Sequence, residues 1–466
     1  MKTTDTVRME SAVWLVRNLM PATRNYGPLT VAALAIALAV EWFVVGPSDG
    51  SWSSFVGQLA GAEAVLLLSV AIVLISVLPW VEAWFDGIDH AAIWHRRFAL
   101  VGLLLVVVPH TLLSVGKGQG KVLGGLGMAG LIALALWAVL PRWRAMLSWT
   151  RRSRTAFPAR KPCVTTGRLR VWTRKVFGGY ERWRLMHKLT GLFLAAGVVH
   201  GYMDGSAFHS PVLRWTYLGI SGTGLATYVY RETIARFFVP MHDYQVSSVS
   251  VIGPGTTELA LKPLGRPMTF IPGQFAMLYM EGKSGWRRHP FTMSGAPDDG
   301  VLRFTIKALG DDTGELQDLV QPGMPAVVSG PHGRFQHTRG TGHQIWIAGG
   351  IGITPFLSWL RALDSHPLAA QVDFYYSTDG PAPFVAEITQ IAATHPNLRV
   401  HFRDSRTDGR ITPNDVLAGA PGSASGVSVF LCGPTPMVKG LAQGPQGLRK
   451  AGVPSRNIYR EHFDWR

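Results

Sequence analysis

Six long apolar runs fill the first half of the chain, and they restrict its possible folds more than any other feature. They lie at approximately Leu29–Val45, Ala62–Val81, Phe98–Val115, Val122–Leu140, Leu189–Met203 and Leu213–Tyr230. Runs of this length favour helices that cross a bilayer, and flanking Trp, Tyr and His can complete the shorter ones at the interfaces. We therefore expect a six-helix transmembrane bundle over residues 1–235, in a multi-pass protein of the cell membrane.

The distribution of basic residues sets the expected orientation of these helices. Thirteen Lys and Arg residues but only one acid, Glu181, lie between Arg142 and Arg184. A basic loop between two apolar runs predicts a cytoplasmic position, so the N-terminus and everything after Tyr230 are expected in the cytosol. The net charge of +16 then reflects membrane topology and not nucleic-acid binding. A site for anionic lipid or for a regulatory protein is the alternative interpretation of this loop, but no protein partner is required.

The second half of the chain, from Pro240 onward, has the composition of a soluble protein. Residues 240–337 alternate short β-type strings with turns, which predicts an antiparallel β-barrel. Residues 338–466 alternate strands with helices, which predicts an α/β domain with a parallel sheet. The two cysteines, Cys163 and Cys432, are too few for a cysteine-ligated iron–sulfur cluster. Any redox centre must therefore be organic or held by histidine.

Four histidines lie inside or at the ends of the third and fifth apolar runs. His95 and His110 are fifteen residues apart, and His187 and His200 are thirteen apart. On helices with a rise of 1.5 Å per residue these spacings are about 22 and 20 Å, which leaves room for two haems across a membrane. Ionisable residues within spans are usually functional, and imidazole is a common ligand of haem iron. The alternative is that all four are interfacial histidines with satisfied hydrogen bonds.

The angular phase of these histidines is not that of ideal helices. Fifteen residues leave His95 and His110 about 60° apart around the helix axis, and thirteen leave His187 and His200 about 140° apart. Pro109 could host a kink or bulge that absorbs a residue and narrows the first angle. The sequence offers no such explanation for the second.

Five short motifs follow one another in the second half. They are Pro272-Gly273-Gln274-Phe275, Arg288-His289-Pro290-Phe291-Thr292-Met293-Ser294, Thr305-Ile306-Lys307, Gly349–Pro355 (GGIGITP) and Cys432–Met437 (CGPTPM). Together they resemble the ferredoxin-reductase-like module of the NADPH oxidase and ferric reductase superfamily. The four histidines resemble the haem ligands of that superfamily, whose fifth span also has a thirteen-residue spacing. The third span departs from it, with fifteen residues in place of thirteen or fourteen.

The resemblance implies roles for particular residues in binding FAD and the nicotinamide nucleotide. Those implied at the flavin ring are His289, Pro290, Phe291 and Thr292, with the Thr292 hydroxyl near N5 of the ring. Those implied at the FAD pyrophosphate are Lys307, Thr313 and Gly314, the last two opening a short helix. Those implied for NADPH or NADH are Gly349, Gly350, Gly352, Thr354, Pro355, Cys432 and Gly433, with Cys432 beside the nicotinamide C4.

The chain ends in two alternating aromatic residues, Phe463 and Trp465. The superfamily is similar in closing with an aromatic residue that stacks on the isoalloxazine, and we expect Trp465 in that position, with Phe463 as second choice. Both could instead pack at the domain edge. Thr292, Cys432 and Trp465 are therefore the expected catalytic residues.

The implied function is electron transfer from cytosolic NAD(P)H through FAD and two b-type haems to an acceptor on the outer side. His95 and His187 would ligate the inner haem, and His110 and His200 the outer one. Oxygen, reduced to superoxide, is the leading acceptor; ferric chelates, a quinone and a periplasmic protein are alternatives. Cationic residues expected on the outer surface, which suit superoxide formation or anionic chelates, are Lys117, Lys121, His209 and Arg214.

Other interpretations remain open from the sequence. The chain could be a flavin reductase anchored by haem-free spans, or a transporter or channel with pore histidines and a regulatory nucleotide domain. The choice between NADH and NADPH is open too. Ser377 and Thr378, with Arg403 or Arg406, could hold a 2′-phosphate, whereas Asp379 would repel one.

Overall fold

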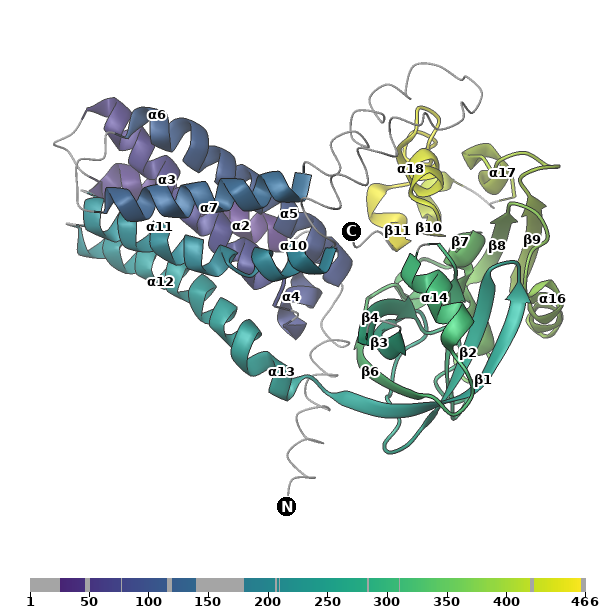
Figure 1. The fold of residues 1–466 in the computed structure, drawn as a ribbon. Helices are drawn as coiled ribbons and strands as arrows, with labels where there is room; N and C mark the ends of the chain where they lie inside the picture. The colour runs from purple at the N-terminus through teal and green to yellow at the C-terminus, as the bar shows by residue number, and fades with distance from the viewer. Residues whose placement is uncertain are drawn as a thin grey trace, which may run out of the picture. The chain divides into compact units, whose positions relative to one another are not determined.

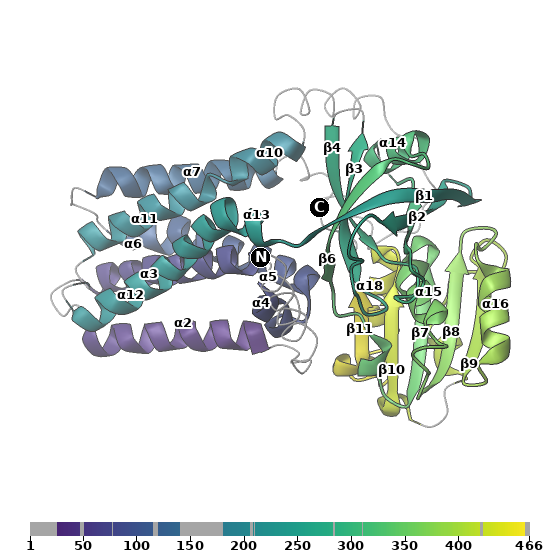
Figure 2. The ribbon, with the colours of Figure 1, turned by 90° about the horizontal axis from the view of Figure 1, so that it is seen from below.

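The computed structural model describes residues 26–46, 51–76, 78–114, 120–139, 180–205, 208, 210–282, 285–309, 311–419 and 423–461. The chain divides into two units, which Figures 1 and 2 draw from two directions. The helical unit comprises Asn25–Val81 and Ala91–Arg236. The reductase unit comprises Glu82–His90 together with the chain from Phe237 onward. Most of the basic loop expected between Arg142 and Arg184 lies outside the described residues.

The helical unit is a bundle of helices lying side by side (Figures 1 and 2). Its principal helices are α2 (Tyr26–Val45), α3 (Trp52–Leu74), α5 (Ile88–Leu105), α7 (Lys121–Val139), α10 (Tyr180–His187), α11 (Thr190–Asp204) and α12 (Pro211–Val229). Shorter helical segments are α4 (Pro79–Trp84), the π-helical turn η1 (Val106–His110), α6 (Thr111–Leu113), the π-helical turn η4 (Tyr230–Ile234) and α13 (Ala235–Phe238).

Four of the described helical stretches are long and apolar enough to cross a membrane. They are Tyr26–Val45, Trp52–Leu74, Ile88–Leu113 and Lys121–Ala138. The second begins ten residues before the expected Ala62, because Ser51 caps the helix by accepting a hydrogen bond from the Ser54 amide. Helices α11 and α12 do not meet the same criterion of length and apolarity, so the six expected spans are supported only in part.

Helix α3 lies in the interior of the bundle and contacts α11 and α12. Its buried residues Val65, Leu68 and Ile72 pack with Leu194 of α11 and Tyr217 of α12. Small residues allow other helices to approach closely. A Cβ placed on Gly127 of α7, for example, would lie 2.8 Å from the carbonyl oxygen of Phe193 in α11.

The first domain of the reductase unit is an antiparallel six-stranded sheet, as expected for residues 240–337. Its strands are β1 (Met241–Gly253), β2 (Thr256–Pro263), β3 (Phe275–Gly282), β4 (Gly285–Thr292), β5 (Leu302–Lys307) and β6 (Pro325–His332), in the order β4-β3-β6-β1-β2-β5. Helix α14 (Asp311–Leu319) follows β5. The buried side chains of Tyr244, Leu261, Leu278 and Phe304 belong to the core of this half-barrel.

The second domain is a parallel five-stranded sheet flanked by helices, as expected for residues 338–466. Its strands are β7 (His343–Gly349), β8 (Gln371–Thr378), β9 (Leu398–Asp404), β10 (Val427–Cys432) and β11 (Ile458–Glu461), in the order β11-β10-β7-β8-β9. Its helices are α15 (Thr354–Arg361), α16 (Val385–Thr394), α17 (Pro413–Leu417) and α18 (Thr435–Gln443). The strand order reverses between β7 and β10, and sheets of this kind bind ligands at the carboxyl ends of strands beside such a reversal.

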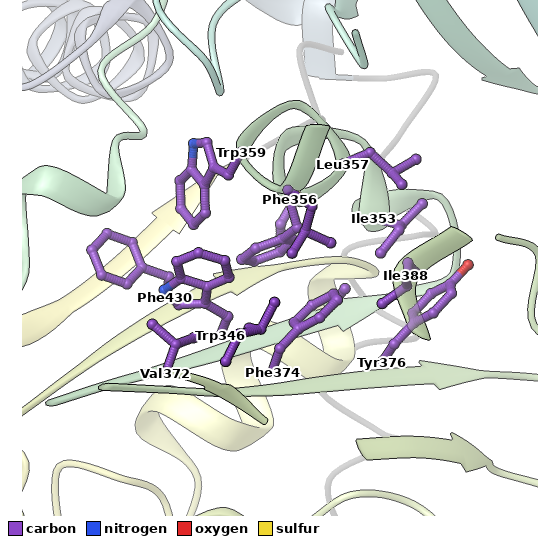
Figure 3. Packing of buried hydrophobic residues seen from close by; sticks show 14 of the residues in the cluster. Trp346, Ile353, Phe356, Leu357, Trp359, Val372, Phe374, Tyr376, Ile388 and Phe430 are labelled. Carbon is purple, nitrogen blue, oxygen red and sulfur yellow. The ribbon is translucent and has the colours of Figure 1, made fainter. Parts of the chain in front are cut away.

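A dense aromatic cluster packs α15 and the sheet of this domain together (Figure 3). Trp346 of β7, Phe374 of β8 and Phe430 of β10 contact the rings of Phe356 and Trp359 from α15, and all five side chains are fully buried. This packing fixes the position of α15, which begins beside the glycine-rich turn at the end of β7.

The two domains of the reductase unit are joined by the largely buried side chain of Arg361, at the end of α15. Its Nη1 lies 2.7 Å from the Glu258 carboxylate of β2 and 3.0 Å from the Ser294 carbonyl oxygen. Its Nε and Nη2 bond both carboxylate oxygens of Glu387 in α16, at 2.6 and 3.0 Å. The carboxylates hold the pKa of Arg361 above its usual range despite burial, so the guanidinium stays charged.

The segment Glu82–His90 belongs to the reductase unit although it lies between α3 and the body of α5 in sequence. The Glu82 carboxylate accepts a hydrogen bond from the Gly333 amide at 2.7 Å, and Asp86 forms an ion pair with Arg339 at 2.6 Å. Both side chains of that ion pair are largely buried. No pattern in the sequence predicts these contacts.

We predict that Arg361→Met lowers the stability of the protein by about 3 kcal/mol, because it removes the ion pairs of Arg361 with Glu258 and Glu387 and leaves the Glu258 carboxylate with its longer ion pair, 3.6 Å, to Arg303. The measurement is the midpoint of thermal unfolding of the detergent-solubilised full chain. Arg399→Met is the matched control, since Arg399 is 60% exposed in its ion pair with Asp373, and exposed pairs contribute at most about 1 kcal/mol. Equal midpoints for the two variants would contradict the prediction.

Candidate functional site

The four histidines of the apolar runs form two pairs within the helical unit. The ring centroids of His95 and His187 are 6.3 Å apart, with the rings at 89° to each other. Those of His110 and His200 are 6.0 Å apart, with the rings at 74°. In each pair one histidine comes from α5 or its continuation η1, and the other from α10 or α11. The pairing therefore follows the expectation from the sequence.

Carbonyl groups of α3 fix the orientation of the first histidine of each pair. The Nδ1 of His95 lies 2.7 Å from the Ala71 carbonyl oxygen, and the Nδ1 of His110 lies 2.9 Å from that of Gly57. A carbonyl oxygen can only accept, so each Nδ1 must carry a hydrogen and donate it. In a neutral imidazole this leaves the Nε2 lone pair free to bind a metal.

A π-helical turn brings His110 towards the phase of His95. The turn spans Val106–His110 and contains Pro109, which has no amide hydrogen to donate to the helix. Each residue of a π-turn rotates the chain by less than 100°, so the turn reduces the 60° offset of an ideal helix. The bulge at Pro109 predicted from the sequence is confirmed.

A break between α10 and α11 changes the phase of His187 relative to His200. Lys188 and Leu189 lie between the two helices, and their amides donate to carbonyls three residues back, at 3.2 and 2.9 Å. Such tight turns rotate the chain by more than 100° per residue, which reduces the 140° offset of an ideal helix. This break supplies part of the rotation that the thirteen-residue spacing requires.

The flavin motif lies on β4 and is supported by the turn before β3. Gln274 is fully buried there; its side chain accepts from the Ile271 amide at 2.9 Å and donates to the Gly333 carbonyl oxygen at 3.2 Å. Thr292, paired with Phe275 in the strand register, is only 3% exposed. Its hydroxyl is buried and makes no hydrogen bond to any described residue, as expected of a group that awaits a ligand.

The other residues predicted to contact FAD lie on β4, on β5 and in helix α14. His289, Pro290 and Phe291 precede Thr292 on β4 and are half-buried. Lys307 ends β5, half-buried. Thr313 and Gly314 are the third and fourth residues of α14 and therefore lie in its first turn, where backbone N–H groups have no partner within the helix. Their predicted contact with the FAD pyrophosphate stays a prediction. The Thr313 hydroxyl accepts from the Leu309 amide at 3.0 Å, which tightens the first turn.

The glycine-rich turn after β7 lies directly against the turn after β10. A Cβ on Gly352 would lie 2.4 Å from the carbonyl oxygen of Cys432, and one on Gly433 would lie 3.0 Å from the backbone of Gly349. Gly350 has a φ of +53°, which an L side chain rarely adopts. The chain thus needs glycine here for the two turns to meet at the carboxyl ends of neighbouring strands. Thr354 and Pro355 are buried in the first turn of α15 and support this arrangement.

Cys432 is fully buried at the end of β10, opposite Glu461 in the register with β11. Burial, and then the neighbouring Glu461, raise the pKa of the Cys432 thiol, so it stays protonated. Burial likewise raises the pKa of the Glu461 carboxyl well above its usual range. The Glu461 Oε2 makes no hydrogen bond to a described residue. A neutral acid at this edge can donate a hydrogen bond to a ligand.

Sequence reasoning missed Glu461. The signal that could have identified it is an acid in the short strand Ile458–Glu461, at the same edge as the Cys432 motif. The predicted aromatic residues that follow it, Phe463 and Trp465, lie outside the described residues, and so do Lys117 and His209. Their predicted roles stay predictions.

The residues that could decide between NADH and NADPH lie at the ends of β8 and β9. Ser377 and Thr378 are each 8% exposed, and the Thr378 hydroxyl donates to the Gly380 carbonyl oxygen. Arg403 bonds the Gly409 carbonyl oxygen and Asp415. Arg406 is exposed and forms an ion pair with Asp379 at 2.7 Å. Arg406 is therefore the better placed of the two arginines to meet a 2′-phosphate, but Asp379 competes for it.

Two family models match the second half of the chain: an FAD-binding domain over residues 241–341 and an oxidoreductase NAD-binding domain over residues 346–443. The reductase component of the naphthalene 1,2-dioxygenase system of Pseudomonas putida is 28% identical over 212 residues, which are 43% of this chain and 62% of that protein. The propane 2-monooxygenase reductase component of Mycolicibacterium smegmatis is 30% identical over 222 residues, with the same two coverages. The chain thus spans less than two thirds of the length of these relatives.

The FAD/NAD-binding domain of nitric oxide dioxygenase from Vibrio cholerae, a solved structure, aligns with 47% of this chain and 97% of its own length. Its TM-score is 0.42 and its sequence identity 20%. The family matches agree with the antiparallel sheet, the parallel sheet and the motifs at their edges. The second half of the chain thus contains an FAD-binding domain and an oxidoreductase NAD-binding domain, and it is similar to the reductase components of these two systems.

Proposed function

We propose that this protein is a transmembrane oxidoreductase that moves electrons from cytosolic NAD(P)H through FAD and two bis-histidine haems to an acceptor on the outer side, with oxygen as the leading acceptor. The observation that carries the proposal is the pairing of His95 with His187 and of His110 with His200 in an apolar helical unit. The same chain holds an FAD-binding and an NAD-binding domain, which would supply the electrons.

The two histidine pairs fit haem iron. Two imidazoles that hold one metal ion through nitrogen bonds of about 2 Å would have their centroids about 6 Å apart, close to the 6.3 and 6.0 Å of these pairs. A porphyrin supplies four further nitrogens, so two protein ligands suffice. Among the described residues no group of three or more His, Cys, Asp or Glu could hold a metal without such help.

Glycines beside the outer pair support the same interpretation. A Cβ on Gly61 of α3 would lie 2.8 Å from the His110 ring, and one on Gly124 of α7 would lie 2.7 Å from the His200 ring. Each imidazole therefore occupies space that only glycine leaves open. Such close support holds a side chain in one orientation, as a metal ligand requires.

The surface of the helical unit supports a lipid environment. Large apolar side chains are exposed on several helices, among them Ile36, Leu104, Leu112 and Val122. Exposure of so many large apolar side chains to water is unfavourable, whereas lipid chains would cover them. We propose a multi-pass location in the cell membrane, with both the N-terminus and the reductase unit in the cytosol.

The reductase unit would bind the nucleotide and position it. The Gly349–Gly352 and Cys432–Gly433 turns bring backbone close to a ligand at the strand ends, and the protonated Cys432 thiol and Glu461 carboxyl give that edge neutral donors. The Thr292 hydroxyl would donate to or accept from the flavin. When bound, a flavin accepts hydride and releases electrons one at a time, and haem carries single electrons onward.

The acceptor is proposed on chemical grounds. His110 and His200 would both hold the iron of the outer haem, so the acceptor would receive electrons without binding the metal. Of the cationic residues expected outside, Lys121 begins α7 and Arg214 lies in α12. A ferric-chelate reductase of the same architecture is the second candidate, and a haem-free anchored flavin reductase the third. The FAD and NAD domains favour all three over a channel with pore histidines.

An assay in proteoliposomes separates the acceptors. We predict that NAD(P)H oxidation by the full chain reduces cytochrome c in air, and that superoxide dismutase suppresses this reduction. If the oxidation needs a ferric chelate and yields no superoxide, the ferric-reductase alternative replaces the oxidase.

Variants of the outer pair test the haem ligands. His110→Ala and His200→Ala should each remove about half of the haem absorbance while NAD(P)H still reduces the flavin, because the inner pair and the module are untouched. His366→Ala, in the nucleotide domain, is the control and should keep all the haem. An outer variant that retains full haem and full outward electron transfer would show that the ligand assignment is wrong.

Thr292→Val tests the flavin contact, because it should raise the stability of the flavin-depleted protein and lower its affinity for FAD. A buried hydroxyl without a partner costs about 1–3 kcal/mol, so flavin-depleted Thr292→Val protein should unfold at a higher temperature than the flavin-depleted wild type. FAD affinity should fall about tenfold, the usual size for one lost hydrogen bond.

Thr305→Val is the matched control for Thr292→Val. The Thr305 hydroxyl donates to Ser294 at 2.9 Å, so its loss should destabilise the flavin-depleted protein. Unchanged FAD affinity in Thr292→Val would refute the proposed contact.

A further inference from the structure

We propose that the Asp204 carboxylate accepts a hydrogen bond from His200 and thereby lowers the reduction potential of the outer haem; this rests on the proposed function. Asp204 is the last residue of α11, one helical turn after His200. Its Oδ2 lies 3.4 Å from the His200 Nδ1, and its side chain is 8% exposed.

Neither atom of this contact has a hydrogen-bond partner in the described part of the chain. The His200 Nδ1 and the Asp204 Oδ2 are both buried, and neither makes a hydrogen bond to a described residue. At 3.4 Å the two atoms are at ion-pair distance, although not in hydrogen-bond geometry. A buried carboxylate oxygen without a donor is strongly unfavourable, so the N–H of His200 is its natural partner.

A purely structural role explains the position of only one of the two Asp204 carboxylate oxygens. Its Oδ1 accepts from the Gly120 amide at 2.9 Å, immediately before α7, where the helix dipole favours a negative charge. An asparagine would cap that helix equally well. The cap does not account for the second oxygen facing a histidine, nor for a charge at the C-terminus of α11, where the dipole disfavours it.

The other three histidines have neutral partners. His95 and His110 donate to carbonyl oxygens of α3, and the His187 Nδ1 lies 3.5 Å from the Thr190 hydroxyl. Within the described residues, His200 alone of the four faces a carboxylate. A negative acceptor increases the electron donation of an imidazole to its metal and stabilises the oxidised iron. The outer haem thereby becomes the stronger one-electron reductant, which suits an acceptor that never binds the iron.

The test is a redox titration of both haems in the full-length protein, with Asp204→Asn compared with the wild type. Asparagine keeps an oxygen for the Gly120 amide and removes the charge. At any fixed potential the ratio of reduced to oxidised outer haem should rise about tenfold, a midpoint shift of about 59 mV for one electron. The inner haem should not shift. Glu41→Gln, which removes an acid of the same unit that accepts from Thr216, should move neither haem.

A converse variant keeps the proposal testable if Asp204→Asn loses its outer haem. Thr190→Asp places a carboxylate beside His187 at the first position of α11, where an acid is favourable. The reduced fraction of the inner haem should then fall about tenfold at fixed potential. An unshifted outer haem in Asp204→Asn, or an unshifted inner haem in Thr190→Asp, overturns the inference and leaves the proposed function intact. Wild-type protein without a second haem overturns both.

Discussion

The alignment of four imidazoles on two irregular helices is the constraint on which the account of the helical unit depends. On ideal helices these histidines could not face each other in pairs at both ends, because fifteen- and thirteen-residue spacings rotate them apart. Each residue of the π-turn at Val106–His110 rotates the chain by less than in an α-helix, and each residue of the turn at Lys188–Leu189 rotates it by more. The two distortions are opposite in sense, and each reduces the angular offset that its own spacing produces.

Helix α3 gives this arrangement its rigidity. It is packed in the interior of the bundle, and two of its carbonyl groups, at Gly57 and Ala71, hold one histidine of each pair by Nδ1. The same bonds select the tautomer that leaves Nε2 available. Packing, hydrogen bonding and the chemistry of the site are therefore set by one element, and a shift of α3 would disturb both pairs together.

Much of this organisation could be predicted from the sequence, because apolar runs and strand alternation report burial directly. The runs led to α2, α3, α5 and α7, and the motifs led to the edges of the two sheets where Thr292 and Cys432 lie. Pro109 predicted an irregularity in the helix, because proline removes a helix hydrogen bond.

The remaining features depend on tertiary contacts that leave no local pattern. Nothing in Lys188-Leu189 distinguishes a turn from a continuous helix, since both residues are ordinary helix formers. Glu461 looks like one acid among several near the C-terminus, and only its burial beside Cys432 sets it apart. Asp204 resembles a helix-end residue until the unpaired Nδ1 of His200 is seen beside it.

The central claim is that one chain joins an NAD(P)H-reducible flavin to two haems, and an anaerobic visible spectrum of the purified full-length protein tests it most directly. Expressed with ample haem supply, the protein should contain one flavin and two low-spin haems per chain, and NAD(P)H alone should reduce all three. A protein whose flavin is reduced by NAD(P)H but whose spectrum has no Soret band would contradict the account.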